Sequence, residues 1–256
     1  MAKTAALVAF DVGNTRLKAA VLAAGRWKVL FTIATRPVET LGARLADALA
    51  GCGDAIPMGP RRWVAASVST EADEALAEDC RRRGVPGPEM FGRDVPVSMP
   101  VLVREPAKVG VDRLLCALGA RKLVGAPCIV VSAGTAITVD LVDAEGRFAG
   151  GAIAPGFSLS ARALHEGTSL LPLVGPTVPE RAAGLDTVEA IQSGVYHSCR
   201  GGVRELVRLL AEGCSTPPPV VVTGGDAGVL LPLDVGCEVR EAPELVFVGM
   251  AAALGL

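Results

Sequence analysis

Residues 7–27 read LVAFDVGNTRLKAAVLAAGRW, and residues 128–148 read CIVVSAGTAITVDLVDAEGRF. When the two stretches are aligned without a gap, Gly13 aligns with Gly134 and Gly25 aligns with Gly146. Both predict an apolar strand, a glycine-centred turn, a second apolar strand, another turn and a third strand. A matched order of this kind indicates a duplicated unit, and it decides the fold class.

Helices and further strands follow each copy. The first half predicts helices over 38–50, 70–83 and 109–124, a strand over 63–68 and a stretch over 86–106 that is mostly loop or edge strand. Thr70 is the expected cap of the second helix, with Asp73 completing a capping box and Gly84 ending the helix. We therefore predict an α/β protein with two similar halves, residues 1–120 and 121–256, around a nucleotide cleft.

The second half predicts a helix from residue 158, a longer one over 187–211, a strand over 219–223 and a final helix over 244–254. The apolar stripe expected along the longer helix consists of Val188, Ile191, Val195, Cys199, Leu206 and Leu210.

Composition narrows the possible partners. The net charge of -2 argues against nucleic acid or an anionic membrane surface as the main partner, because both require clustered basic charge. The mean hydropathy of +0.44 is high, yet the longest charge-free run contains Pro127 and Gly134 and is too short for a membrane span. We expect the apolar surplus to cover a subunit interface. Seven scattered cysteines indicate a reduced cytoplasmic chain.

The first turn of the repeat carries polar residues suited to phosphate. Gly13 is expected to adopt a positive φ in a tight hairpin. Asn14 and Thr15 offer hydrogen-bond donors to phosphate oxygens, and Lys18 offers positive charge. Asp11 is a candidate ligand of Mg²⁺ through water. An ordinary Gly-Asn hairpin explains the same residues, so this loop alone is not decisive.

A second loop, 132–136, repeats the turn with Gly134 and the hydroxyl of Thr135. A third glycine-rich turn, 223–227, is expected to follow a strand and open a helix, where an adenosine or a phosphate can bind. Three such loops, two of them in equivalent places of the two halves, indicate a nucleoside triphosphate site.

These motifs together resemble the type III pantothenate kinases, the family that includes the Bvg accessory factors. The family is part of the acetate and sugar kinase and actin superfamily, whose members share a duplicated ribonuclease H-like fold. The resemblance covers nearly the whole chain and is carried by DVGNTRLK, PAKVGVDR, AGTAITVD, GGAIAPG, GLDTVEAIQSGV and TGGDA. It implies ATP-dependent phosphorylation of pantothenate, the first step towards coenzyme A, by a homodimer.

The resemblance also implies roles for individual residues. Asp112 becomes the general base, and Arg113 holds the pantothenate carboxylate; a helix-terminal ion pair is the plain alternative for these two. Thr187 becomes a substrate-binding residue, for which the alternative is a helix cap. Gly110 and Val111 complete the implied substrate site. The implied ATP-binding residues are Asp11, Val12, Gly13, Asn14, Thr15, Arg16, Leu17, Lys18, Gly134 and Thr135.

Two positions depart from the family pattern. Ser132 stands where the family has an Asp that binds a monovalent cation, K⁺ or NH₄⁺, and a neutral hydroxyl is a poorer ligand for such an ion. Val103 stands where the family has a substrate-contacting Tyr. An active kinase with altered cation use is the favoured interpretation. A non-catalytic regulatory homologue and a kinase for another small hydroxy acid or sugar remain the alternatives.

Overall fold

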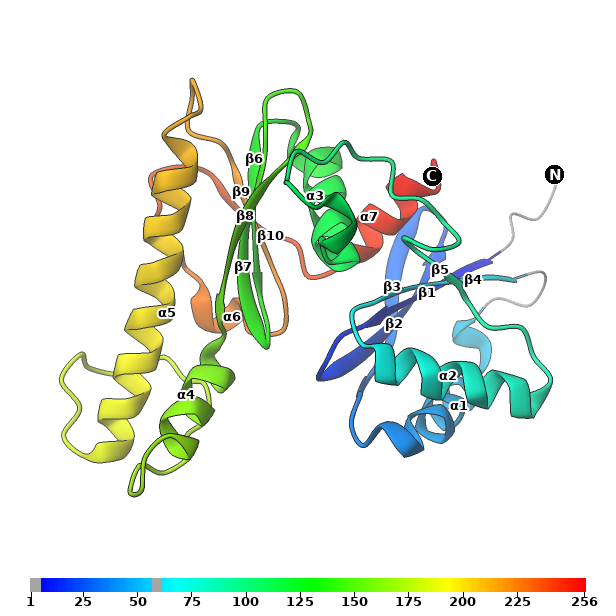
Figure 1. The fold of residues 1–256 in the computed structure, drawn as a ribbon, viewed down its shortest axis with the longest axis horizontal. Coiled ribbons are helices and arrows are strands. Elements are labelled where there is room, and N and C mark those ends of the chain that lie inside the picture. The colour runs from blue at the N-terminus through cyan, green and yellow to red at the C-terminus, as the bar shows by residue number, and fades with distance from the viewer. Residues whose placement is uncertain (1–5, 57–60) are drawn as a thin grey trace. The chain divides into compact units, whose positions relative to one another are not determined.

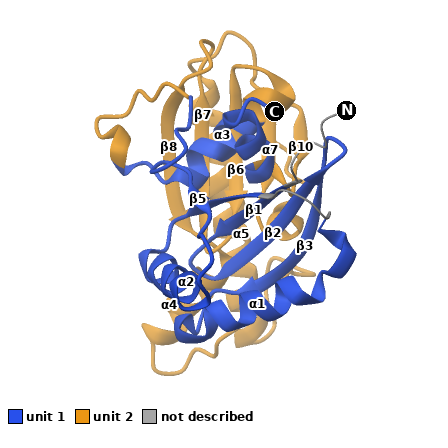
Figure 2. Cartoon of the chain, turned by 90° about the vertical axis from the view of Figure 1, so that its right-hand side faces the viewer, with its two compact units in different colours: residues 1–98, 108–119, 246–256 blue, residues 99–107, 120–245 orange. Residues whose placement is uncertain are grey.

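The computed structural model describes residues 6–56 and 61–256 of the chain. The chain forms two compact units: unit 1 comprises residues 1–98, 108–119 and 246–256, and unit 2 comprises residues 99–107 and 120–245 (Figure 2). The main division falls within one residue of the expected boundary at 120. Two segments, 99–107 and 246–256, are grouped with the opposite half from the one expected.

Unit 1 is built on a five-stranded sheet in the order β3-β2-β1-β4-β5 (Figure 1). Its strands are β1 (Ala6–Val12), β2 (Arg16–Ala23), β3 (Arg26–Ala34), β4 (Arg61–Ser67) and β5 (Glu89–Met90). The first three strands pair antiparallel, and β4 joins β1 in parallel. The short helices η1 (Val38–Thr40) and η2 (Gly53–Ala55) flank α1 (Leu41–Gly51), which packs beside α2 (Thr70–Arg83).

Unit 2 repeats this order in a second sheet, β10-β9-β6-β7-β8. Its strands are β6 (Cys128–Ala133), β7 (Ala136–Val142), β8 (Phe148–Pro155), β9 (Val220–Thr223) and β10 (Val239–Glu241). Its helices include α4 (Phe157–Glu166), α5 (Thr187–Ala211) and α6 (Ala227–Leu230). Again the first three strands pair antiparallel and the fourth joins the first in parallel. The predicted duplicated α/β fold is therefore confirmed.

The central strands are apolar because both of their faces are buried. In unit 2, Val131, Val139 and Val222 point to the face that α5 covers, where Ile191 and Val195 pack against them (Figure 1). Burial of such side chains contributes about 1.5–3 kcal/mol each. The expected stripe of α5 is correct for these two residues but wrong at its start, because Val188 is 42% exposed.

Helix ends show what local signals can and cannot fix. The expected limits of α2 and α5 agree with the structure, and Gly84 ends α2 in the left-handed conformation (φ 64°). Both expected caps are wrong, because each lies one residue earlier. Ser69 accepts from the N–H of Ala72, and Asp186 accepts from the N–H of Glu189.

Three further helices complete the chain: η3 (Pro106–Lys108), α3 (Val111–Val124) and α7 (Leu245–Ala253). Two contacts pack α7 into unit 1: the ring of Phe247 lies 5.3 Å from that of Trp27, and Gly249 lies against the carbonyl of Leu115. Among the helices of the described residues, none is both long and apolar enough to span a membrane.

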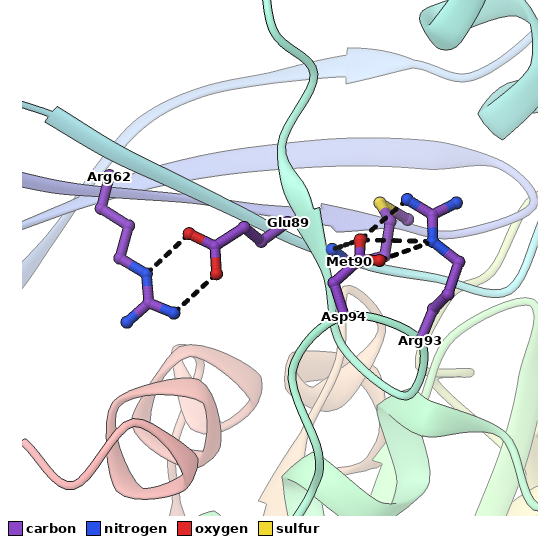
Figure 3. Close-up of polar contacts among 5 residues, drawn as sticks. All are labelled: Arg62, Glu89, Met90, Arg93 and Asp94. Carbon is purple, nitrogen blue, oxygen red and sulfur yellow. Dashed lines mark hydrogen bonds and ion pairs between the residues drawn. The ribbon is translucent and has the colours of Figure 1, made fainter.

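The edge of the unit 1 sheet is fastened by exposed ion pairs (Figure 3). Arg62 on β4 donates two hydrogen bonds, of 2.9 and 2.7 Å, to the carboxylate of Glu89 on β5. Asp94 accepts from the N–H of Met90 and pairs with Arg93, which closes the turn after β5. These contacts hold a two-residue strand that the apolar pattern alone does not predict.

Candidate active site

The β1–β2 loop of unit 1 presents polar groups at the end of two buried strands. Asn14, Thr15 and Arg16 are exposed, whereas Val12 and Leu17 are buried in the core of unit 1. Of the expected ATP-binding residues, these last two therefore offer only their backbone. The N–H of Gly13 donates to the carbonyl of Arg16 at 2.9 Å, which closes the hairpin.

The reason expected for Gly13 is wrong. Gly13 does not adopt a positive φ, whereas Gly25 (φ 74°) and Gly146 (φ 76°), in the second turn of each repeat copy, do. A Cβ at position 13 would lie 3.2 Å from the carbonyl oxygen of Arg16, which is closer than side chains usually approach. The hairpin therefore favours glycine because of crowding and not because of its backbone angle.

Three predicted charged residues meet in unit 1. Asp11 is the cross-strand partner of Lys18 in the β1–β2 ladder. Burial and the nearby charge of Asp112 raise the pKa of Asp11 to about 6, while Lys18 opposes this shift. Two carboxylates from distant parts of the sequence thus share one electrostatic environment beside the loop, as expected for a phosphoryl-transfer site.

Asp112 lies in the first turn of α3. Its Oδ1 accepts from the backbone N–H of Arg113 at 2.8 Å, and Gly110 accepts from the same N–H at 3.1 Å. Burial raises the pKa of Asp112, although Arg113 acts against the shift. A Cβ at position 110 would lie 2.5 Å from Oδ1 of Asp112, so the carboxylate position requires glycine there.

The β6–β7 loop of unit 2 is uncharged at the corresponding place. Ser132 on β6 is the register partner of Thr138 on β7 and of Thr223 on β9. The Thr138 hydroxyl is buried and has no hydrogen-bond partner within residues 6–56 and 61–256. The carboxylate on this part of β7 is Asp140, which is 1% exposed and engaged in an interaction of its own.

The three glycine-rich motifs of unit 2 meet around this loop. The N–H of Gly156 donates to the carbonyl of Thr135 at 3.0 Å, and that of Asp226 donates to the carbonyl of Ala133 at the same distance. A Cβ at position 156 would lie 2.0 Å from the carbonyl oxygen of Gly134, and one at position 224 would lie 2.1 Å from that of Ala133. Both positions therefore require glycine. The expected helix after the third motif exists as α6, with four residues.

Thr187 and Val103 also lie in unit 2. Thr187 begins α5 and lines a groove of about 940 Å³ between α4 and α5, together with Ser160, Leu164, Leu185 and Ile191. Because Asp186 caps the helix, capping does not explain Thr187. Val103 approaches Gly150, at 3.5 Å from the position of its missing Cβ, at the start of the glycine-rich strand β8.

Sequence reasoning missed two residues beside the first loop. Thr35 follows β3 and donates its hydroxyl to the carbonyl of Gly13 at 2.8 Å. Arg44 on α1 donates to the carbonyl of Thr35 at 3.3 Å. Neither residue belongs to a motif, and the contacts arise only when β3 folds back along β2, so no local signal marks them.

Comparison with known proteins places this chain among kinases. A family model for type III pantothenate kinases matches residues 7–209. A type III pantothenate kinase from Rhodopirellula baltica is 37% identical over 266 aligned residues, which cover 93% of this chain and 95% of that protein. A second, from Akkermansia muciniphila, is 34% identical and covers 88% of each chain.

Solved structures share the fold at low sequence identity. A Baf family protein from Campylobacter jejuni, described as a putative transcriptional activator, superimposes with a TM-score of 0.59 at 18% identity, covering 97% of both chains. MreB5 of Spiroplasma citri, solved with AMPPNP, gives a TM-score of 0.55 at 12% identity, covering 98% of this chain and 96% of that chain. These likenesses show the actin-like fold and nothing finer.

Proposed function

The chain belongs to the type III pantothenate kinase family, and from this premise we propose that it transfers the γ-phosphoryl group of ATP to the primary hydroxyl of pantothenate. The observation that carries the proposal is the meeting of Asp11, Lys18 and Asp112 beside the β1–β2 loop. Phosphoryl transfer depends chiefly on positioning and charge neutralisation, and this group of residues supplies both.

In the proposed reaction, Asp112 accepts the hydroxyl proton of pantothenate as its oxygen bonds to the γ-phosphorus. The bond from that phosphorus to the bridging oxygen breaks, and ADP leaves. The raised pKa of Asp112 makes its carboxylate a stronger base than an exposed aspartate. Arg113 pairs with the carboxylate of pantothenate, because a guanidinium fork fits that group.

The residues that we propose to bind ATP are Asn14, Thr15, Arg16 and Lys18 in the first loop and Gly134 and Thr135 in the second. Asp11 fits a role as a Mg²⁺ ligand through water, because the charge of Asp112 reaches its carboxylate and a cation relieves their repulsion. Mg²⁺ bound with ATP supplies further neutralisation of phosphate charge.

The surroundings of Ser132 do not fit a carboxylate site for K⁺ or NH₄⁺. Its register partners are the hydroxyl residues Thr138 and Thr223, and the nearest carboxylate along β7, that of Asp140, is already engaged. Neutral hydroxyls attract a monovalent cation less than a carboxylate does. We therefore propose that turnover depends little on K⁺ or NH₄⁺.

We also propose a homodimer that works in the cytoplasm. Exposed apolar side chains gather on and between α4 and α5, and large contiguous patches of this kind usually mark interfaces. They are Leu159, Leu164, Leu170, Leu173, Val178, Leu185 and Val188. Sedimentation of Leu164→Asp tests this face, which we expect to yield monomers. All seven cysteines are free, which supports a reducing compartment.

Mass spectrometry of the products of ATP, Mg²⁺ and candidate acceptors tests the function. We expect phosphorylated pantothenate from the parent protein and at least about a hundredfold less from Asp112→Asn. Turnover with only another hydroxy acid or a sugar would mean that the protein is a kinase for that acceptor instead of pantothenate. Nucleotide binding without turnover on any acceptor would instead support the regulatory homologue, an outcome that the Ser132 and Val103 departures make worth measuring.

A further inference from the structure

The backbone of the β1–β2 loop is held by a residue that lies outside it. Thr35, the first residue after β3, is 1% exposed. Its hydroxyl donates to the carbonyl of Gly13 at 2.8 Å, and its backbone N–H donates to the carbonyl of Thr15 at 2.9 Å. One buried threonine therefore binds both ends of the three-residue loop.

The two bonds have an electrostatic consequence for an anion. In a planar trans peptide, the carbonyl of one residue and the N–H of the next point in opposite directions. The bond from Thr35 to the Gly13 carbonyl therefore turns the N–H of Asn14 to the opposite side of the loop. Phosphate is attracted by N–H groups and repelled by carbonyl oxygens, so this orientation favours an anion on the side away from Thr35.

Thr35 is in turn held by α1. The guanidinium of Arg44 donates to three backbone carbonyls. They are those of Ala34, of Thr35 at 3.3 Å and of Pro37 at 2.7 Å. The side chain of Arg44 thus fixes the connection between β3 and α1. Displacement of this connection would move the Thr35 hydroxyl away from the loop.

Unit 2 shows that the hydroxyl is not a general requirement of the fold. Gly156 follows β8 as Thr35 follows β3, and its N–H donates to the Thr135 carbonyl in the same way. The β6–β7 loop is one residue shorter, and any Cβ at position 156 would lie 2.0 Å from the carbonyl of Gly134. The backbone bond is common to both units, whereas the side-chain bond is confined to unit 1.

We propose that Thr35 is a positioning residue for nucleotide binding, which orients the β1–β2 loop through its hydroxyl, and that Arg44 holds Thr35 in place. The inference rests on the proposed function of this loop in binding the phosphates of ATP. A purely structural tie between β3 and the hairpin would affect stability but would not distinguish ATP from pantothenate.

Four variants test the proposal: Thr35→Val, Thr35→Ser, Arg44→Lys and the control Thr70→Val, at an exposed residue in the first turn of α2. We expect Thr35→Val to raise the KM for ATP about tenfold, which equals about 1.4 kcal/mol, with the KM for pantothenate unchanged. Thr35→Ser keeps the hydroxyl and should restore the parent value. Arg44→Lys should raise the KM for ATP about threefold, and Thr70→Val should leave it unchanged.

Calorimetric binding of ADP and thermal unfolding without nucleotide accompany the kinetics. A folded Thr35→Val with unchanged KM for ATP and unchanged ADP affinity would overturn the proposal, as would an equal rise in both KM values. If Thr35→Val does not fold, Arg44→Lys and Thr35→Ser give the decision by the same measurements. A parent protein that neither binds ADP nor phosphorylates pantothenate would contradict the proposed function itself, which is a separate result.

Discussion

The β1–β2 hairpin of unit 1 and the β6–β7 hairpin of unit 2 occupy the same place in sheets of the same order. At the end of the first, Asp11 faces Lys18 across the strands; at the end of the second, Ser132 faces Thr138. Duplication thus preserved the backbone plan while the two ends diverged in charge. The difference teaches that the fold requires the turn, whereas the proposed chemistry requires charge in one copy only.

The largest effect is expected when the carboxylate of Asp112, near the charged hairpin, is removed. We expect Asp112→Asn to lower kcat by about 10²–10⁴-fold, because a general base contributes about that much. The free energy of unfolding of Asp112→Asn at pH 7 should exceed that of the parent. The charge of Asp112 raises the pKa of Asp11 and opposes its ionisation, so removing that charge removes an unfavourable interaction. Asp47→Asn, on the exposed face of α1, is the control. Retained turnover in Asp112→Asn would contradict the catalytic role.

A pH titration of stability is the next test. The pKa of Asp11 is about 6 in the folded protein, against an ordinary value of 3.8, so the folded state binds more protons between these values. Ionisation of Asp11 therefore lowers the free energy of unfolding as the pH rises from about 4 to about 6. We expect Asp11→Asn to exceed the parent by about 2 kcal/mol more at pH 7 than at pH 4. Chemical denaturation at several pH values measures the difference, and parallel curves would refute it.

A negative charge introduced at position 132 tests whether the uncharged β6–β7 hairpin accounts for the weak dependence on K⁺ that we propose. We expect Ser132→Asp to gain stimulation by K⁺ of about fivefold, equal to about 1 kcal/mol of coupling. The neutral, similarly sized Ser132→Asn should respond to K⁺ no more than the parent does. Steady-state rates in K⁺ and in a large organic cation provide the measurement. An equal response of all three proteins would show that position 132 does not control cation use.

The smallest effect is expected at the sheet edge, where charge pairs are exposed. Arg62 and Glu89 are 44% and 46% exposed in their side chains, so water screens their attraction. Arg62→Ala should lower the free energy of unfolding by about 0.5 kcal/mol and leave turnover unchanged. Thermal unfolding with Glu89→Gln as the partner variant completes the check. A loss of several kcal/mol would mean that this exposed pair stabilises the fold as much as a buried one.

Much of the fold was predictable from local patterns in the sequence. Apolar runs bounded by glycine located β1, β2, β6 and β7. The limits of α2 followed from capping signals and Gly84, and α5 followed from its apolar stripe. The edge strand β5 lies in the stretch expected to be mostly loop or edge strand, but its two-residue limits were not predicted. The three-residue strand β10 was not predicted at all, because strands so short carry no periodic signal. The β6–β7 loop is one residue shorter than the β1–β2 loop, and this difference was also missed. A later turn restores the alignment of the two copies, so they align without a gap.

The candidate site was predictable where charge and glycine coincide in one motif. Asp11, Lys18 and Asp112 came from such motifs, and the structure brings them together. Thr35 and Arg44 were not predictable, because their importance lies in hydrogen bonds to carbonyls of residues distant in the sequence. Every residue has a backbone carbonyl, so the sequence does not show which carbonyl accepts a hydrogen bond from a distant side chain.

Helix α7 has a consequence for how the protein is made. Residues 246–256 are grouped with unit 1, although 99–107 and 120–245, the whole of unit 2, are synthesised before them. Phe247 meets Trp27, and Gly249 rests on Leu115, so the interior of unit 1 is incomplete until this stretch leaves the ribosome. The unit that begins the chain is therefore completed last, and Asp112, the proposed base at the start of α3, lies in an incomplete core until then.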